Sequence, residues 1–228
     1  MTAKQQVVLS WSSGKDSATA LAALQADPTV ELRGLFTTLN GEADRVAMHA
    51  VRRTLLRAQA EAAGLPLFEV DLPSPCTNDE YLARVRDALE PLVRDGVEAM
   101  AFGDLYLPDV RKFREDQCDE GGLGHLFPLW GRDTRALAEE MIASGREATL
   151  TCADPKVLDP SFAGRPFDAA LLDALPGGAD PCGENGEFHT FVHACPAFRA
   201  PIDVEVGERV ERGGFVFCDV LPRHGADQ

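Results

Sequence analysis

The chain has 228 residues, 45% of them hydrophobic, which is enough for one large domain or for a moderate domain with a smaller second one. Its formal net charge of −15 repels nucleic-acid backbones at long range, and no basic run offsets that charge, so we expect no nucleic-acid partner and disfavour a tRNA-modifying enzyme. The chain has no apolar run of about 18 residues and no signal-peptide pattern, so we expect a soluble cytoplasmic protein with no membrane partner. It has no Cys-x-x-Cys pair, so we expect its cysteines to be reduced thiols.

The first predicted strand, Val7–Ser10, runs straight into the small residues Ser12–Gly14, and an Ala/Leu-rich helix over 18–26 follows. Backbone N–H groups converge at such a turn and bind anions, and the helix dipole adds partial positive charge. Lys15 adds a full charge, and we expect Asp16–Ser17 to cap the helix. The pattern predicts a phosphate cradle made by Ser10, Ser12, Ser13, Gly14, Lys15, Asp16 and Ser17.

The spacing in this turn excludes the Gly-x-x-x-x-Gly-Lys-Ser/Thr loop and the Gly-x-Gly-x-x-Gly fingerprint. The stretch Ser-Ser-Gly-Lys-Asp-Ser, residues 12–17, resembles instead the Ser-Gly-Gly-x-Asp-Ser loop of ATP pyrophosphatases. These enzymes split ATP between its α and β phosphates to adenylate a substrate. Ser13 stands where that pattern most often has glycine, which matters if the backbone there needs a positive φ.

Strands and helices alternate over the first part of the chain, which predicts right-handed βαβ units and a parallel sheet. The further strands are expected at Leu32–Thr38, Leu67–Asp71 and Ala99–Gly103. Helices are expected around Val51–Ala62, ended by Gly64, and around Tyr81–Leu92, ended by Gly96 and kinked or shortened by Pro91.

The alternation stops near Trp130, and a helix over 134–144, a short run over 148–152 and a β-type stretch over 215–218 follow. We therefore predict an ATP-binding domain over residues 1–130 and a smaller α+β lobe over 131–228. Ligands of such sheets collect at the carboxyl ends of the strands. This places Gly103 and Asp104 beside the cradle, and makes Asp16 and Asp104 the candidate ligands of Mg²⁺ or of its water shell. The alternative is structural, with Asp16 as a cap and Asp104 as a turn residue.

A second polar cluster, Asp180–Thr190, concentrates carboxylates, an amide, an imidazole and a hydroxyl between glycines. Such a loop predicts a binding site. The competing interpretation is that Asn185–Gly186 is only a hairpin turn and that the charges face solvent.

With this cluster included, the chain resembles the diphthine ammonia ligase branch of the ATP pyrophosphatases over nearly its whole length. The matching stretches are Trp11–Ser17, Met48–His49, Ala101–Asp104, Arg111, Arg114–Glu115, Cys118, Pro128–Trp130, Ala163–Arg165 and Asp180–Thr190, whereas Val192–Pro196 departs from the family pattern. The resemblance implies an adenine nucleotide α-hydrolase-like (HUP-type) α/β domain with a parallel sheet, followed by a lobe that holds the acceptor. The family amidates the carboxylate of diphthine, a modified histidine on elongation factor 2, and converts ATP to AMP and pyrophosphate.

For this chemistry we expect the acceptor carboxylate to attack the α-phosphate while Lys15 and the cradle stabilise the departing pyrophosphate. Glu184, Asn185, Glu187 and Thr190 are expected to bind ammonium or the acceptor. His189 is the candidate base, because the usual histidine pKa of about 6.5 lies near working pH. Lys15, Asp16, Glu187 and His189 form the predicted catalytic set.

Four further residues are candidates for binding the acceptor. Arg111 and Arg114 share a helical face and can hold a phosphate or a carboxylate, while Glu115 can bind the acceptor or only pair with them. His49 is a weaker candidate, because we expect its segment to be a helix that serves mainly in packing.

Alternatives remain open at this level. The same adenylating chemistry can serve a small-metabolite acceptor in a bacterium that lacks diphthamide, and the fold can serve as a non-catalytic nucleotide sensor. A glutaminase role for Cys118 or Cys182 is disfavoured because the chain has no room for a glutaminase domain, so free ammonium is the expected donor. A homodimer is left open.

Overall fold

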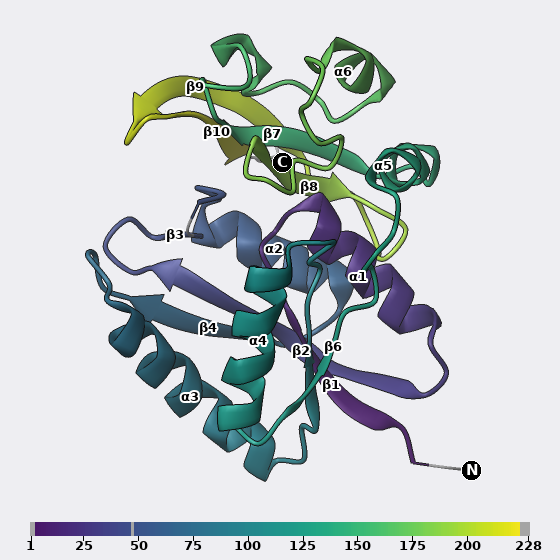
Figure 1. Cartoon of the computed structure of the whole chain (residues 1–228), viewed down its shortest axis with the longest axis vertical. Coiled ribbons are helices and arrows are strands. Elements are labelled where there is room, and N and C mark those ends of the chain that lie inside the picture. Colours follow the sequence, from purple (N-terminus) through teal and green to yellow (C-terminus); the bar gives the residue numbers. More distant parts are fainter. Residues whose placement is uncertain (1–2, 47, 224–228) are drawn as a thin grey trace, which may run out of the picture.

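Two β-sheets, one above the other along the long axis of the molecule, organise the protein into two lobes (Figure 1). The computed structural model describes residues 3–46 and 48–223. The first sheet contains β1 (Gln5–Ser10), β2 (Val30–Asn40), β3 (Arg45–Val46), β4 (Leu67–Leu72), β5 (Ala99–Ala101) and β6 (Gly124–Leu126).

The pairing in the first sheet is parallel apart from β3. β2 pairs with β1 and β4, β1 with β5, and β5 with β6, while β3 lies antiparallel to the end of β2. β1 lies between β2 and β5, so the strand order reverses at its carboxyl end, where ligands of such sheets bind. The predicted parallel α/β fold is confirmed.

Helices cover both faces of this sheet, which explains why β1 reads as a continuous apolar run. Val7 and Leu9 pack with α1 and α2, whereas Val8 packs on the opposite side with α3 and α4. The helices are α1 (Lys15–Ala26), α2 (Arg53–Ala63), α3 (Asn78–Arg94) and α4 (Pro108–Glu120).

The helix ends agree largely with the sequence signals. α2 ends at Gly64, whose φ of +67° is the left-handed conformation expected of a terminating glycine. α3 begins with a capping box between Thr77 and Glu80 and continues through Pro91 to Arg94. Of the two expected effects of Pro91, shortening of the helix is therefore wrong.

The second lobe is a smaller α+β unit, as predicted, and its sheet is antiparallel. Its sheet has the order β8-β7-β10-β9. The elements are α5 (Thr134–Ala143), β7 (Glu147–Ala153), a 3₁₀ turn (Pro160–Phe162), α6 (Ala169–Ala174), β8 (Phe188–Ala194), β9 (Val204–Arg212) and β10 (Phe215–Pro222). None of the helices within residues 3–46 and 48–223 is long and apolar enough to cross a membrane.

The two lobes share one hydrophobic cluster and direct backbone contacts. Leu21 of α1 and Phe191 of β8 belong to the same buried cluster. The Val192 N–H of β8 donates to the Ser13 carbonyl at 3.0 Å, and the Arg199 N–H donates to the Ala62 carbonyl at 2.7 Å. The loop after β1 therefore lies against the second lobe.

Candidate active site

The loop after β1 has a positive φ at Ser13, the position where the ATP pyrophosphatase pattern most often has glycine. Ser13 has φ +71°, a conformation that costs a non-glycine residue about 1 kcal/mol. The buried amide of Gln59 stabilises this shape, since its Nε2 donates to the carbonyls of Ser13 at 3.1 Å and Val192 at 2.6 Å, while its Oε1 accepts from Trp11 Nε1 at 2.9 Å. Ser13 Oγ is buried and has no partner among the described residues.

Helix α1 begins directly after this loop, with Gly14 as the preceding residue and no side-chain cap. The expectation that Asp16 and Ser17 cap the helix is wrong. Ser17 Oγ donates back to the Gly14 carbonyl at 2.9 Å, and Asp16 turns toward Lys15. A cap is unnecessary here because the Thr190 hydroxyl accepts from the Lys15 N–H at 3.0 Å, and the remaining first-turn N–H groups stay available to an anion.

Gly103, at the end of β5, allows this helix start to lie close to the sheet. A Cβ atom at Gly103 would lie 3.0 Å from the backbone of Asp16 and of Ser17. Asp104 follows Gly103 and lines the cavity that opens in front of the loop. The predicted grouping of the ends of β1 and β5 is therefore present in the structure.

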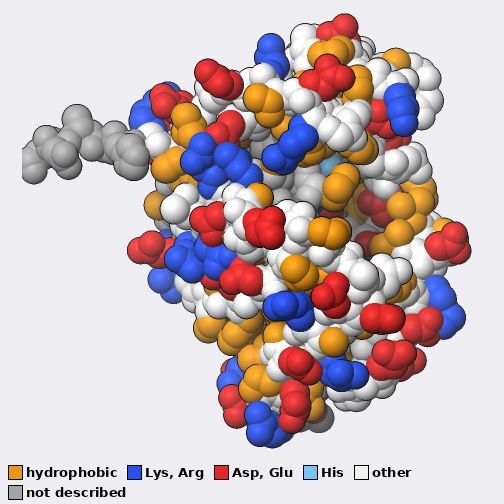
Figure 2. All heavy atoms as spheres, turned by 90° about the vertical axis from the view of Figure 1, so that its left-hand side faces the viewer, with side chains coloured by type: hydrophobic (Ala, Val, Ile, Leu, Met, Phe, Trp, Pro, Cys, Tyr) orange, Lys and Arg blue, Asp and Glu red, His pale blue; other side chains and the backbone are white. Residues whose placement is uncertain are grey.

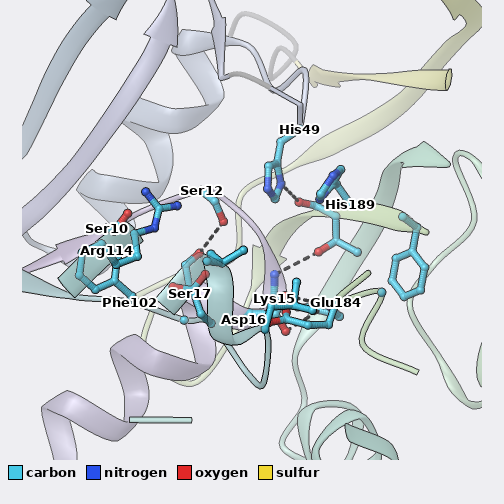
Figure 3. Close-up of a pocket in the computed structure, with 17 residues that line it drawn as sticks. Ser10, Ser12, Lys15, Asp16, Ser17, His49, Phe102, Arg114, Glu184 and His189 are labelled. Atoms are coloured by element: carbon cyan, nitrogen blue, oxygen red, sulfur yellow. Dashed lines mark hydrogen bonds and ion pairs between the residues drawn. The ribbon is translucent and has the colours of Figure 1, made fainter. Parts of the chain in front are cut away.

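A cavity of about 270 Å³ opens in front of the loop, and Figure 3 shows the residues around it. From the predicted nucleotide-binding set the cavity is lined by Ser10, Ser12, Lys15, Asp16, Ser17, Gly103 and Asp104. From the predicted acceptor and ammonium set it is lined by His49, Arg114, Glu184 and Thr190, and the predicted base His189 lines it as well. Figure 2 shows that the surface is hollowed between the lobes, with a histidine side chain visible inside.

A second cavity of about 280 Å³ adjoins the first and shares Ser10, Ser12, His49, Arg114 and His189 with it. Its other walls are largely apolar and come from Trp11, Phe36, Val46, Met48, Val85 and Met100, together with Thr38, Tyr81 and Gln117. Sequence reasoning did not single out Phe36 or Met100. The available signal was their position in the sheet, because Phe36 pairs with Ser10 at the end of β1 and Met100 lies in the short strand β5.

Lys15 is buried, with only 2% of its side chain exposed. Its Nζ donates to Asp16 Oδ2 at 2.8 Å and to the carbonyl of Cys182, and it lies 5.5 Å from the ring centre of Phe167 and 5.3 Å from that of Phe188. Burial alone works to lower the pKa of Lys15, but Asp16 and the other neighbouring groups outweigh it and the pKa is raised. The side chain therefore carries its charge inside the protein.

The two histidines lie together close to the phosphate loop (Figure 3), and a Cβ atom at Gly14 would lie 2.9 Å from Cε1 of His49. The ring centres of His49 and His189 are 4.6 Å apart, and His49 Nδ1 lies 3.1 Å from the Thr190 carbonyl. Burial lowers the pKa of His49 to about 4 and lowers the pKa of His189 well below its ordinary value. Both rings are neutral at pH 7.

His49 lies in a turn between β3 and α2, so the expectation that it lies on a packing helix is wrong. Met48 and Ala50 on either side have φ values of +59° and +54°, which a right-handed helix does not allow. Met48 is also 50% exposed. The turn directs the imidazole toward the cavity.

Glu184 is the carboxylate of the second cluster that reaches the cavity. Its Oε1 accepts from the Leu105 N–H at 2.7 Å, and burial raises the pKa of Glu184 to about 7. Burial also raises the pKa of Asp104, although Arg114 opposes this effect.

Asn185 and Glu187 are not among the residues that line the cavity. Glu187 is 4% exposed, and its carboxylate accepts from the Asp180 N–H at 2.9 Å, from Asn185 Nδ2 at 3.0 Å and from the Asn185 N–H at 3.0 Å. These bonds lie within the 180–188 loop and fix its shape.

The two arginines of α4 have different surroundings. Arg111 lies between the rings of Phe127 and Trp130, 4.7 Å from each centre, and its Nε donates to Glu115 at 2.7 Å. The structure brings neither Arg111 nor Glu115 into the cavity lining. Arg114 lines both cavities, and its buried Nε has no partner among the described residues.

The candidate Mg²⁺ ligands, Asp16 and Asp104, line the same cavity. Within the described part of the chain no group of three or more His, Cys, Asp or Glu side chains forms a ready metal cluster. Magnesium in nucleotide-binding enzymes takes one or two carboxylates together with phosphate oxygens and water. Two carboxylates beside a phosphate loop fit an ion of this kind.

Comparisons with known proteins identify the family. Residues 5–125 match the model of the diphthamide synthase N-terminal domain and residues 133–221 that of the diphthamide synthase C-terminal domain. The chain is 31% identical over 195 residues to diphthine–ammonia ligase of Bos taurus, covering 78% of this chain and 73% of the relative. It is 30% identical over 234 residues to diphthine–ammonia ligase of Danio rerio, covering 92% of this chain and 90% of the relative. The chain therefore belongs to the diphthamide synthase family.

Proposed function

We propose that the protein adenylates an acceptor carboxylate with ATP and then aminates it with ammonium, and that the acceptor is diphthine on elongation factor 2. As a member of this family the chain is an ATP-dependent ligase. The observation that carries the proposal is that one cavity joins the phosphate loop at Ser12–Ser17 to the buried carboxylate of Glu184. We also propose that residues 1–130 bind ATP and that residues 131–228 bind the acceptor.

In the first step an acceptor oxygen attacks the α-phosphorus, the bond between the α-phosphorus and the bridging oxygen breaks, and pyrophosphate leaves with the electron pair. The free N–H groups at the start of α1 and the guanidinium of Arg114 stabilise the negative charge on pyrophosphate. Mg²⁺ held by Asp16 and Asp104 would neutralise part of the same charge. The second cavity has apolar walls suited to adenine, such as Phe36 and Met100.

In the second step the nitrogen of ammonia attacks the acyl carbon, and the bond from that carbon to the AMP oxygen breaks, so AMP leaves with the electron pair and takes up the proton that the attacking nitrogen loses. Ammonium first gives up a proton. We assign this proton to Glu184, whose pKa of about 7 suits an acceptor at neutral pH. His189 and His49 are weaker bases, because burial lowers the pKa of each ring.

Omitting the acceptor or ammonium from the complete reaction tests this proposal. Purified protein is incubated with MgATP, ammonium chloride and elongation factor 2 carrying diphthine, while AMP, pyrophosphate and the mass of the modified residue are measured. Amidation with AMP and pyrophosphate is expected only when acceptor and ammonium are both present. Formation of ADP and phosphate would overturn the ligase mechanism, and a small carboxylic acid that is amidated in place of diphthine would overturn the acceptor.

A further inference from the structure

The Lys15 ammonium group is buried at the wall of the cavity, between oxygen acceptors and two aromatic rings. Its Nζ has the two carboxylate oxygens of Asp16 at 2.8 and 3.1 Å and the Cys182 carbonyl as hydrogen-bond acceptors. The faces of Phe167 and Phe188 lie 5.5 and 5.3 Å from it. We call the Asp16 carboxylate, the Cys182 carbonyl and these two rings the cation cage.

The cation cage has the composition that a free ammonium ion requires. Oxygen acceptors satisfy the N–H groups, one carboxylate balances the charge, and two aromatic faces attract a desolvated cation. A lysine head group and an ammonium ion carry the same charge and differ only in that an N–H replaces the bond to Cε. A site built for one therefore accepts the other once the lysine has left.

The 180–188 loop is held in the shape that builds this cage. Asp180 Oδ1 accepts from the N–H groups of Cys182 at 2.8 Å and Glu184 at 3.2 Å, and Glu187 accepts from the Asp180 N–H at 2.9 Å. These bonds direct the Cys182 carbonyl inward. The buried carboxylates of Asp180 and Glu187 thus position the cage, and Glu184 faces the cavity beside it.

We propose that the cation cage is the binding site of the substrate ammonium, and that in the nucleotide-free enzyme the side chain of Lys15 occupies it. The proposal rests on the ligase function given above. Lys15 is the first residue of α1 and directly follows the phosphate loop, so bound phosphates offer its Nζ a second, more highly charged partner. When ATP binds, Lys15 turns to the phosphates and ammonium takes its place beside Glu184, where one oxygen of the Asp16 carboxylate accepts from ammonium and the other is left to Mg²⁺.

This exchange orders the reaction. Ammonium enters only after ATP has drawn Lys15 away, and it restores the positive charge that the Asp16 carboxylate and the Cys182 carbonyl would otherwise lack. One charged side chain therefore serves both half-reactions. It neutralises phosphate when ATP is present and fills the ammonium site when ATP is absent.

A nucleotide-free measurement tests the cage independently of activity. The melting temperature of Lys15→Ala is measured in ammonium, potassium and sodium chloride at equal ionic strength, with wild type, Lys15→Ala/Phe188→Leu and the exposed-site control Lys112→Ala alongside. Ammonium at about ten times its Kd is expected to raise the melting temperature of Lys15→Ala by about 3 to 6 °C over sodium. Wild type and Lys112→Ala are expected to show no difference between ammonium and sodium. The added Phe188→Leu substitution is expected to reduce the difference that Lys15→Ala shows. Equal effects of ammonium and potassium, or of all three salts, would overturn the assignment.

The second measurement uses wild-type protein, so it does not depend on the folding of a variant. The NMR signal of protein-bound ¹⁵N-ammonium is recorded with and without a non-hydrolysable ATP analogue. A slowly exchanging bound signal is expected only with the analogue, and a signal of equal strength without nucleotide would contradict the exchange with Lys15. Neither measurement needs the acceptor. If ammonium binds as expected but no acceptor is amidated, the proposed ligase function is rejected. If the protein amidates the acceptor but shows no ammonium-specific binding, the cation cage is rejected.

Discussion

The hydroxyl of Thr190, on β8 of the second lobe, accepts a hydrogen bond of 3.0 Å from the backbone N–H of Lys15, the first residue of α1. A β-strand far along the chain thus completes the start of the helix that follows the phosphate loop. Figure 1 shows α1 beneath β8, where the two lobes meet. The phosphate loop is therefore a joint product of both lobes.

Replacing Thr190 tests this dependence. Thr190→Val keeps the shape of the side chain but leaves the buried Lys15 N–H without an acceptor, so we expect a loss of about 1 to 3 kcal/mol in the free energy of unfolding and weaker ATP binding. Denaturant titration and calorimetry measure the two effects. Thr190→Ser retains the hydroxyl and is the matched control. Equal stability of the valine and serine variants would show that the bond contributes nothing.

Ser13 gives a test of the loop backbone. Its φ of +71° favours glycine, and its buried hydroxyl has no partner among the described residues. We expect Ser13→Gly to raise the free energy of unfolding by up to about 1 kcal/mol, because relief of the strained φ outweighs the added freedom of the unfolded chain. Ser13→Ala removes the same hydroxyl and keeps the strain, so it separates the two contributions in thermal unfolding. A glycine variant no more stable than the alanine variant would remove strain as a factor.

The sequence predicted the framework of the site well, because strong local signals specify it. Val7–Ser10 is an apolar run followed by small residues, and this pattern alone indicated the strand, the loop and the helix. The three-residue strand β6 (Gly124–Leu126) carried no comparable signal, since its glycine and histidine are poor strand formers and its pairing with β5 holds it in place.

The contacts that decide chemistry were beyond sequence reasoning. Nothing in the spacing of Lys15 indicates that its Nζ meets the Cys182 carbonyl and the ring of Phe167, because those contacts depend on how two sheets pack. The turn at His49 depends on positive φ values at non-glycine residues, which composition does not reveal. Glu187 was predicted to be catalytic from its polar neighbours, but its carboxylate bonds to the backbone of its own loop.

Asp219 on β10 anchors the segment that carries His49. Its carboxylate accepts from Arg45 at 2.8 Å and from Arg52 at 2.5 Å, and Arg45 also donates to the Ala50 carbonyl at 2.6 Å. Although burial alone works to raise it, these two guanidinium groups lower the pKa of Asp219 to about 2. A depressed pKa means that the contribution to stability is present above the unfolded-state pKa of about 4 and is lost as the pH falls toward 2.

We expect Asp219→Asn to lower the free energy of unfolding at pH 7 by about 1 kcal/mol, a value reduced for the solvent exposure of the ion pairs. The difference from wild type should shrink between about pH 4 and pH 2. Urea titrations across this range measure it. Asp203→Asn removes a carboxylate from an exposed pair with Arg223 and should change little. A difference independent of pH would mean that the charge on Asp219 is not responsible.

Glu184 gives the sharpest test of the chemistry, because stability and activity should respond to the same proton. Its folded-state pKa of about 7 lies above the ordinary value of 4.5, so the contribution of Glu184 to stability is greatest below about pH 4.5 and is lost as the pH rises through 7. Glu184→Gln cannot ionise, and should therefore gain stability relative to wild type as the pH increases from about 4.5 to 7. Urea titrations at several pH values follow this gain.

The activity of Glu184→Gln should change in the opposite direction. Wild-type amidation rises with pH as the carboxylate becomes able to accept the ammonium proton, with an apparent pKa of about 7. The glutamine variant should lose roughly 10²- to 10⁴-fold in kcat for amidation and lose that rising limb. Glu120→Gln, at the exposed end of α4, is the control and should keep the wild-type profile. If Glu184→Gln retains the limb, the proton goes to another group, and the assignment made from burial and position is rejected.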